Sequence, residues 1–480
     1  MDSKFKQLVN RQLTASELNR LKRYASWMHQ LVVREWNLSP DITRLITPTS
    51  RDANPLLRFT LQELYWWLNW TNFSFLTSFL SPQLTRIDIT TNSRLSPAET
   101  VEPWVGEIPA DALAAMRSAI NMFPPSLKVL ALRLGDGQET RLTEDISAYI
   151  LKCGESLLEL FSNLVFSIEA LVHLMNLPNL REWTTDQEPP QVADLIRHGV
   201  PDGPASLFPS LQLLQLRGEP ALGWLSFFSA SKDQFPPWTL AGNLIHLTYV
   251  HPAVVVDSSL LSKFLPFTNV VELFVGEGCP LIPLLVDARC TSRFTDQDVE
   301  SLAIAMPKLE VLTLGKWLCG ANTCPTTVLS LLFLSVHCTK LRRLSIHFRT
   351  SNMAADVMAM VDYASSHDLH QKPKCVLNTL VLGCHIPHLE DHEVALVSAG
   401  ISAIFPSLTQ FGDPFNRPHQ LKTKIVTFGT VQKSANLMEV LVDQLKYLRS
   451  FEEHESPSSA LVSTPRLAGE LDDELFKTFV

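Results

Sequence analysis

The residues best suited to chemistry by type and spacing lie in the segment CHIPHLEDH, residues 384–392. His388 and His392 stand four positions apart, and side chains at that spacing share one face of a helix, as two zinc ligands can. However, Pro387 interrupts a helix near its start, and the sequence contains neither an H-E-x-x-H motif nor a second ligand cluster. We therefore interpret these histidines as solvated residues and predict no metal site.

The other reactive patterns are incomplete. Cys319 and Cys324 are spaced C-x4-C, with Cys338 beyond them, but no C-x-x-C pair or partner histidine accompanies them. The glycine pairs at 135–137 and 276–278 form no phosphate-binding loop, and neither a nucleophile elbow nor an acid–base carboxylate pair is present. The sequence therefore predicts no cofactor and no catalytic activity. A metal-dependent enzyme that uses the histidine cluster is the less favoured alternative.

The composition indicates a large folded chain. At 480 residues and 46% hydrophobic content, it has room for several domains or one repeat array. The net charge of −9 argues against nucleic-acid binding through a broad basic surface. No apolar run approaches the roughly 20 residues of a membrane span, and residues 1–13 lack a signal-peptide core. The eight scattered cysteines fit reduced thiols, so we expect a cytoplasmic or nuclear location and no membrane partner.

A leucine pattern, L-x-x-L-x-L, repeats along most of the chain. Clear copies begin at Leu127, Leu211, Leu244, Leu309 and Leu341; looser copies begin at Leu84, Leu180, Val270, Leu377 and Leu408, and weaker ones at Leu61 and Leu157. The steps from Leu84 to Leu408 average about 32 residues, and a period of about 20–50 residues is typical of a solenoid. A proline stands two positions before six of these anchors, at Pro82, Pro125, Pro178, Pro209, Pro307 and Pro406. Because proline ends a helix, each anchor leucine is expected to open a strand.

Helical patterns precede these prolines. Asp111–Phe123 spaces its apolar residues by three and four, and Thr295–Met306 begins with a threonine cap and acidic residues. The same position is filled by Thr143–Leu151, Ser167–Met175, Ser258–Phe264, Thr326–Val336, Ala354–Ala364 and Glu390–Ile404. We predict an α/β leucine-rich repeat solenoid, a horseshoe with a parallel inner sheet, outer helices and helical caps at both ends. The alternative is an ordinary α/β fold in which strands and helices alternate.

The predicted domain organisation has four parts. Residues 1–55 form an N-terminal helical cap or linker with one helix over 13–36, residues 56–430 a solenoid of about 11–12 repeats, residues 431–453 a C-terminal capping helix, and residues 454–480 a disordered acidic Ser/Pro tail. Residues 195–209 and 412–423 are expected to be irregular loops. The aromatic run from Tyr65 to Phe79 is interpreted as packing of the first repeat, with an exposed partner-binding patch as the alternative.

The (Phe/Leu/Met)-Pro-x-Leu-x-x-Leu-x-Leu opening of these repeats resembles the leucine-rich repeat half of fungal F-box proteins, especially those of mushroom-type fungi. Leu13–Val33 is similar to the segment that joins the F-box to the repeats, and Thr295–Trp317 and Thr326–Ile346 are similar to later repeats. The resemblance implies the substrate-recognition part of an F-box type ubiquitin ligase. An F-box of about forty residues does not fit before Leu13, so a Skp-type adaptor is expected only if an F-box lies upstream. A stand-alone repeat protein is the alternative.

The surface expected to bind a protein or peptide is the concave face of the sheet. Strand side chains alternate with period two, so the residues between the leucines face outward there. By this register, the candidates are Arg86, Asp88, Glu182, Asp186, Gln215, Arg217, His246, Glu272, Phe274, Arg343, Ser345, His347 and Arg349. Their mixed charge suits a partner with its own charge pattern. For each residue, a solvated sheet position without a partner is the alternative.

Overall fold

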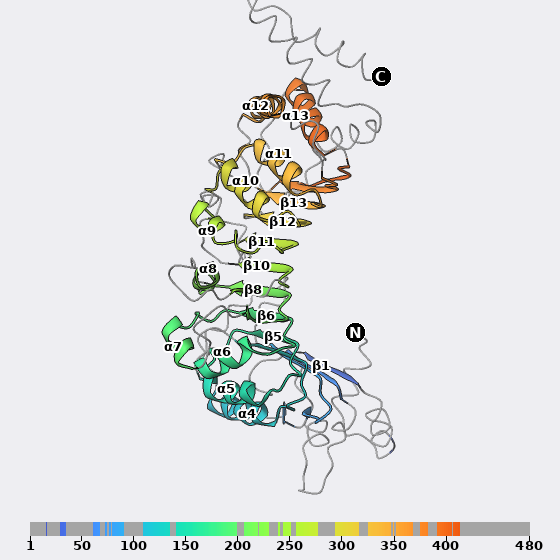
Figure 1. Cartoon of the computed structure of the whole chain (residues 1–480). Coiled ribbons are helices and arrows are strands. Elements are labelled where there is room, and N and C mark those ends of the chain that lie inside the picture. Colours follow the sequence, from blue (N-terminus) through green and yellow to red (C-terminus); the bar gives the residue numbers. More distant parts are fainter. Residues whose placement is uncertain are drawn as a thin grey trace, which may run out of the picture. The chain divides into compact units, whose positions relative to one another are not determined.

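The structure, a computed structural model, describes the repeat-bearing part of the chain with gaps (Figure 1). The described residues are 29–34, 61–67, 79–90, 109–134, 141–198, 206–218, 220–229, 239–240, 243–250, 256–276, 293–315, 325–346, 352–367, 375–382, 391–405 and 407–412, together with the single positions Ser16, Phe73, Leu76, Thr77 and Arg349. The chain divides into two compact units, Met1–Leu244 and Ile245–Val480.

The first unit contains a parallel sheet in which sequential strands are neighbours. Its strands are β1 (Gln30–Arg34), β2 (Glu63–Trp67), β3 (Arg86–Thr90), β4 (Val129–Arg133), β5 (Glu159–Ser162), β6 (Glu182–Thr185) and β8 (Leu213–Arg217). Its helices are α4 (Ala110–Met122), α5 (Thr143–Lys152), α6 (Ile168–Met175), α7 (Val192–Arg197) and α8 (Ala221–Ser229). A separate short pair joins β7 (Ser206–Leu207) to β9 (Thr239–Leu240).

The second unit repeats this plan. Its strands are β10 (His246–Val250), β11 (Glu272–Gly276), β12 (Val311–Leu314), β13 (Arg343–Ile346), β14 (Thr379–Leu382) and β15 (Gln410–Gly412), and each pairs in parallel with the next. Its helices are α9 (Ser258–Ser262), α10 (Asp296–Ala305), α11 (Leu329–His337), α12 (Met353–Ser366) and α13 (Asp391–Ile404). In each unit the helices α4 to α13 that the structure describes lie on one side of the sheet (Figure 1). This architecture confirms an α/β leucine-rich repeat solenoid.

The prolines form the turns that lead from helix to strand. In four repeats the anchor leucine donates its N–H to the carbonyl three residues earlier, and the proline is the second residue of that turn. These bonds run from Leu84 to Ser81 (3.1 Å), Leu127 to Pro124 (3.2 Å), Leu211 to Phe208 (3.1 Å) and Leu309 to Met306 (3.2 Å). The fixed φ angle of proline suits that turn position, so the predicted change from helix to strand is confirmed there.

The leucine pattern forms the core between sheet and helices. The anchor side chains are at most 3% exposed in every repeat, from Leu61 to Leu408. In β8, Leu214 and Leu216 are buried, whereas Leu213, Gln215 and Arg217 are half-buried, as the period of two requires. Successive repeats therefore bury a continuous apolar layer that one repeat alone could not enclose.

The helix ends show why most predicted boundaries hold. Thr295 caps α10 in a reciprocal capping box, because its hydroxyl accepts the Asp298 N–H while Asp298 accepts the Thr295 N–H. Helix α11 begins three residues later than predicted. Thr326 instead donates its hydroxyl to the Phe294 carbonyl (2.5 Å), and Thr327 binds Asp296, so both residues join the preceding repeat.

Two predictions about secondary structure were wrong in part, and one helix was not predicted. Gln30–Arg34 is the strand β1 rather than the end of a helix over 13–36, because this segment pairs along β2 and is rich in β-branched and apolar residues. The expected loop over 195–209 includes the end of α7 and the strand β7. Helix α8 was missed because its sequence, ALGWLSFFS, is too uniformly apolar to show a period. The C-terminal capping helix, the tail and residues 413–423 lie outside the described residues.

Candidate binding face

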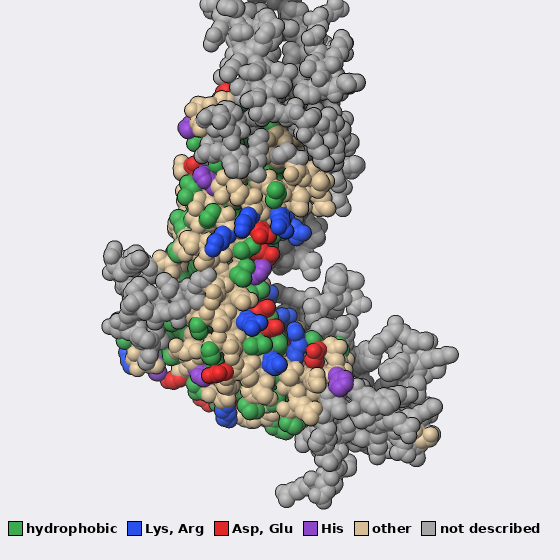
Figure 2. All heavy atoms as spheres, turned by 45° about the vertical axis from the view of Figure 1, so that its right-hand side comes forward, with side chains coloured by type: hydrophobic (Ala, Val, Ile, Leu, Met, Phe, Trp, Pro, Cys, Tyr) green, Lys and Arg blue, Asp and Glu red, His purple; other side chains and the backbone are tan. Residues whose placement is uncertain are grey.

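The exposed side of each sheet carries registered polar and aromatic side chains. We call this side the open face; it is formed by the alternate strand residues that the apolar layer does not bury. Figure 2 brings the strand side of the molecule forward and shows basic and acidic side chains grouped together on it. In each unit the residues of neighbouring strands line up in rows, because the strands are parallel and in regular register.

Two rows cross the first unit. Row one contains Glu63, Arg86, Val129, Glu159, Glu182 and Leu213; row two contains Tyr65, Asp88, Ala131, Phe161, Thr184 and Gln215. Arg133 and Arg217 follow at the carboxyl ends of β4 and β8, and Asp186 directly follows β6. The predicted residues of this unit therefore do come together on one face.

An arginine–tyrosine contact lies at the start of this face. The guanidinium carbon of Arg86 lies 5.3 Å from the centre of the Tyr65 ring, within the range of a cation–π interaction. The Tyr65 hydroxyl donates to Glu63 (3.2 Å), and burial is the main cause that raises the tyrosine pKa. The Nε atom of Arg86 is buried and has no hydrogen-bond partner among the described residues. These contacts hold Glu63, Tyr65 and Arg86 against one another.

Asp88 contributes to this face differently from its neighbours. It is only 7% exposed, and its carboxylate accepts the Thr90 hydroxyl at 3.1 Å. In the register of the strands, Asp88 lies directly opposite the longer Tyr65. Asp88 is therefore mostly buried beneath the open face, where it binds Thr90.

The far end of the first unit combines two arginines with an aromatic ring. The guanidinium carbon of Arg133 lies 5.8 Å from the centre of the Phe161 ring. The Thr184 hydroxyl donates to the side-chain amide oxygen Oε1 of Gln215 at 3.3 Å. Burial lowers the pKa of Arg217; Asp186 partly offsets this effect, and Arg133 adds to it.

The open face of the second unit carries a histidine–carboxylate contact and an aromatic ring. His246 Nδ1 lies 2.9 Å from Glu272 Oε2, in the row that continues through Val311 to exposed Arg343. The next row contains Phe274 and Ser345, and Ser345 is only 7% exposed. The Phe274 ring lies against Gly276, where an added Cβ would meet the ring at 2.9 Å. A larger residue at 276 would displace the ring.

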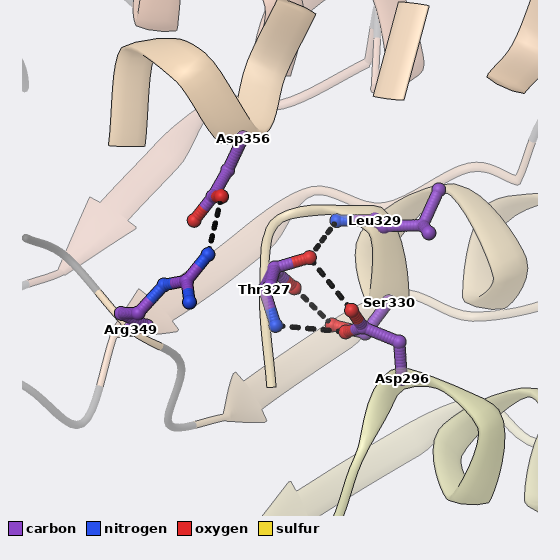
Figure 3. Close-up of polar contacts among 6 residues, drawn as sticks. All are labelled: Asp296, Thr327, Leu329, Ser330, Arg349 and Asp356. Carbon is purple, nitrogen blue, oxygen red and sulfur yellow. Dashed lines mark hydrogen bonds and ion pairs between the residues drawn. The ribbon is translucent and has the colours of Figure 1, made fainter. Parts of the chain in front are cut away.

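The structure corrects the expected position of Arg349. Its Nη2 atom lies 2.7 Å from Asp356 Oδ1, so its side chain is held at the first turn of α12 instead of in register with Arg343 (Figure 3). Asp356 is only 8% exposed, and a buried carboxylate needs a charged partner. This hydrogen-bonded pair raises the pKa of Arg349. His347 lies outside the described residues.

A second carboxylate beside this pair joins two repeats. Asp296 accepts the Thr327 N–H and the Thr327 hydroxyl, each at 2.7 Å (Figure 3). Burial is the main cause that raises the pKa of Asp296, and Asp356 adds to the effect. These contacts connect the starts of α10, α11 and α12, so we assign them a structural role.

The aromatic run from Tyr65 to Phe79 contributes to the hydrophobic core within the described residues. Trp66 and Phe73 are fully buried, Phe79 is 2% exposed, and the Trp66 ring centre lies 5.4 Å from that of Phe79. Tyr65 is the described exception because it points to the open face, as its position in row two requires. The predicted open-face residues did not include Tyr65, Arg133 and Phe161, although the same period of two would have placed them there.

The reactive clusters gain no support from the described residues. Within that part of the chain, no group of three or more His, Cys, Asp or Glu side chains is arranged to hold a metal. Cys338 is buried, and burial raises its thiol pKa to about 12. The side chains of the CHIPHLEDH segment, and Cys319 and Cys324, lie outside the described residues. None of the helices that the structure describes combines the length and apolarity that a membrane crossing requires.

Fold and face together define the class of the protein as a leucine-rich repeat solenoid with a charged, aromatic open face. No protein-family model matches the chain, and no match was found among curated proteins. Among solved structures, the chain is similar to an internalin from Listeria monocytogenes. The two are 13% identical, the alignment covers 82% of this chain and 85% of the internalin, and the TM-score is 0.35.

Proposed function

We propose that this chain is a non-catalytic scaffold that recognises a protein or peptide through the open faces of its sheets. The observation that carries the proposal is the registered row of mixed charges and aromatic rings, in which Arg86 stacks on Tyr65 and Arg133 on Phe161. Arginine and tyrosine are enriched where binding energy concentrates in protein interfaces. Both arginines are held against rings before any partner arrives, so less conformational entropy is lost on binding.

The charge pattern supports a protein partner over nucleic acid. Row one places Glu159 directly opposite Glu182, and the whole chain has a net charge of −9. A phosphate backbone would meet these carboxylates, whereas a protein surface can match both signs. A cytoplasmic or nuclear location is part of this proposal.

We further propose that the bound protein is the substrate of an F-box type ubiquitin ligase. This rests on the resemblance of the repeat openings and of Thr295–Ile346 to the repeats of fungal F-box proteins. A Skp-type adaptor would then be contacted by an F-box outside this sequence. A stand-alone repeat protein with another partner is the alternative outcome.

The test is affinity purification of the tagged protein from the organism that encodes it, with mass spectrometry of its partners. Three forms are compared: wild type, an open-face variant with Arg86→Ala and Glu272→Ala, and a control with Arg117→Ala and Glu300→Ala on helices α4 and α10. We expect partners that the wild type and the control retain and the open-face variant loses.

The two parts of the proposal fail separately. Partners that bind the open-face variant as strongly as the wild type would refute recognition through this face. A Skp-type adaptor and a cullin among the partners support the ligase assignment. Face-dependent partners without an adaptor would favour a stand-alone scaffold.

A further inference from the structure

We propose that the carboxyl-terminal end of β8 forms a seat for a single carboxylate, supplied by an aspartate or glutamate of the bound peptide. The seat consists of Arg133, Gln215 and Arg217, with Phe161 and Thr184 beside them. This inference rests on the proposed function and specifies the kind of peptide that the open face of the first unit recognises.

Arg217 is the central residue of the seat. Its guanidinium is half-buried, yet its Nε atom has no hydrogen-bond partner in the part of the chain that the structure describes. A buried N–H without an acceptor costs free energy, and a charged donor costs more than a neutral one. Burial also lowers the pKa of this arginine, which means that the protein environment disfavours its charge. An anion bound here would supply the missing acceptor and add to the counter-charge of Asp186.

Other donors lie on the same face of the sheet. Gln215 lies two positions before Arg217 on β8, so both side chains emerge on the open face. Its carbonyl oxygen accepts the Thr184 hydroxyl, which directs the amide oxygen to β6 and leaves two amide N–H donors for a ligand. Arg133 lies close enough to Arg217 to lower its pKa, and its guanidinium lies over the Phe161 ring.

The local charge selects a carboxylate over a phosphate. Arg217 interacts with the cationic Arg133 and with the anionic Asp186. A carboxylate carries one negative charge, whereas a phosphate group carries nearly two and would be repelled more strongly by Asp186. Arginine can bind a carboxylate through two parallel hydrogen bonds, which gives geometric selectivity as well as affinity.

The test starts from a random dodecapeptide phage library selected on the full chain. We expect selected peptides to share an aspartate or glutamate at one position. In a synthetic copy of such a peptide, replacing that acid with its amide should weaken binding to the wild type about tenfold or more, because charge-assisted hydrogen bonds are lost. Arg217→Gln should cause a similar loss.

A double-mutant cycle connects the peptide acid to the arginine. In Arg217→Gln, the acid-to-amide change should have little further effect, because the two losses describe one contact. Arg217→Lys, which keeps the charge but lacks the guanidinium fork, should recover part of the affinity. Gln215→Leu, which leaves both arginines in place, should give a smaller loss. Arg117→Gln on α4 is the matched control and should bind like the wild type.

Each contrary result has a distinct meaning. Circular dichroism and thermal midpoints show whether each variant is folded. If Arg217→Gln does not fold, the binding measurements on Gln215→Leu and Arg217→Lys test the proposal instead. Some peptides could bind the Arg86→Ala, Glu272→Ala variant less tightly, show no preference for an acidic residue and bind Arg217→Gln as well as the wild type. That result would refute the carboxylate seat but would still support the scaffold function. Tighter binding of a phosphoserine substitute would overturn the choice of carboxylate. Peptides that depend on no open-face residue would refute both proposals.

Discussion

Replacing Asn163 with alanine should loosen the junction between β4 and β5, the strands that carry Arg133 and Phe161 of the proposed carboxylate seat. The Asn163 side chain accepts the Leu134 N–H at 3.0 Å and donates to the Leu134 carbonyl at 2.6 Å. Leu134 is 2% exposed and directly follows Arg133. The asparagine therefore holds the chain where it leaves β4, next to an arginine of the proposed carboxylate seat.

The expected cost follows from the two groups that lose their partner. A buried backbone N–H or carbonyl left without a hydrogen bond costs about 1–3 kcal/mol. Because Asn163 is itself half-buried and water can reach part of the gap, we expect about 2–4 kcal/mol for Asn163→Ala. Local opening of this segment should become about thirty to several hundred times more frequent.

Hydrogen–deuterium exchange with mass spectrometry measures this opening directly. Peptides that cover β4 and the following residues should lose protection in Asn163→Ala, while peptides from the second unit should not. The matched control is Asn121→Ala, whose amide donates only to the exposed Arg117 carbonyl within α4 and should cost less than about 0.5 kcal/mol. Equal protection in the two variants would refute the reasoning.

Three further predictions concern groups that the fold buries. The pKa of the Asp296 carboxyl is raised in the folded protein above 3.8, its ordinary value in an unfolded chain. This carboxyl therefore stabilises the fold below about pH 3.8, and the stabilisation is lost as the pH rises through the folded-state pKa. The free energy of unfolding of Asp296→Asn, measured in urea, should therefore improve relative to wild type between about pH 4 and about pH 7; a constant difference would contradict this. Trp224→Phe should lower the free energy of unfolding by about 1–3 kcal/mol more than Trp183→Phe does. The reason is that Trp224 Nε1 donates to the Gln187 carbonyl (2.6 Å), whereas Trp183 Nε1 has no partner among the described residues. Equal shifts of the thermal midpoint in the two variants would argue against this prediction. Burial raises the thiol pKa of Cys153 and Cys375 to about 11, so iodoacetamide near neutral pH should label their peptides only after denaturation, and rapid labelling of the native protein would show that these thiols are accessible.

Most of the repeat plan could be predicted because it depends on local chemistry. Pro125 and Pro209 each occupy the second position of a turn, and that position follows from the ring of proline alone. Thr295 and Asp298 form their capping box within one helical turn. The anchor leucines are buried because strand alternation and apolarity are both visible in the sequence.

The candidate site was predictable only to the level of a row. The period of two placed Arg86, Gln215 and Arg217 on one face, and the structure agrees. The same rule failed for Arg349, because a buried carboxylate on α12, seven positions later in the chain, holds its guanidinium. It also could not show that Asp88 is covered while Arg86 lies over a ring.

The repeat, the parallel strands, most helix positions and the side of the sheet that bears the polar residues could be predicted from the sequence. These features arise from residue types within a few positions of one another, where backbone sterics and periodicity decide. The folded chain was needed to show which side chains meet: Arg133 with Phe161, Thr184 with Gln215, and Arg349 with Asp356. Those pairings depend on contacts between residues that can lie tens of positions apart, and on which donors remain without an acceptor once the repeats have stacked.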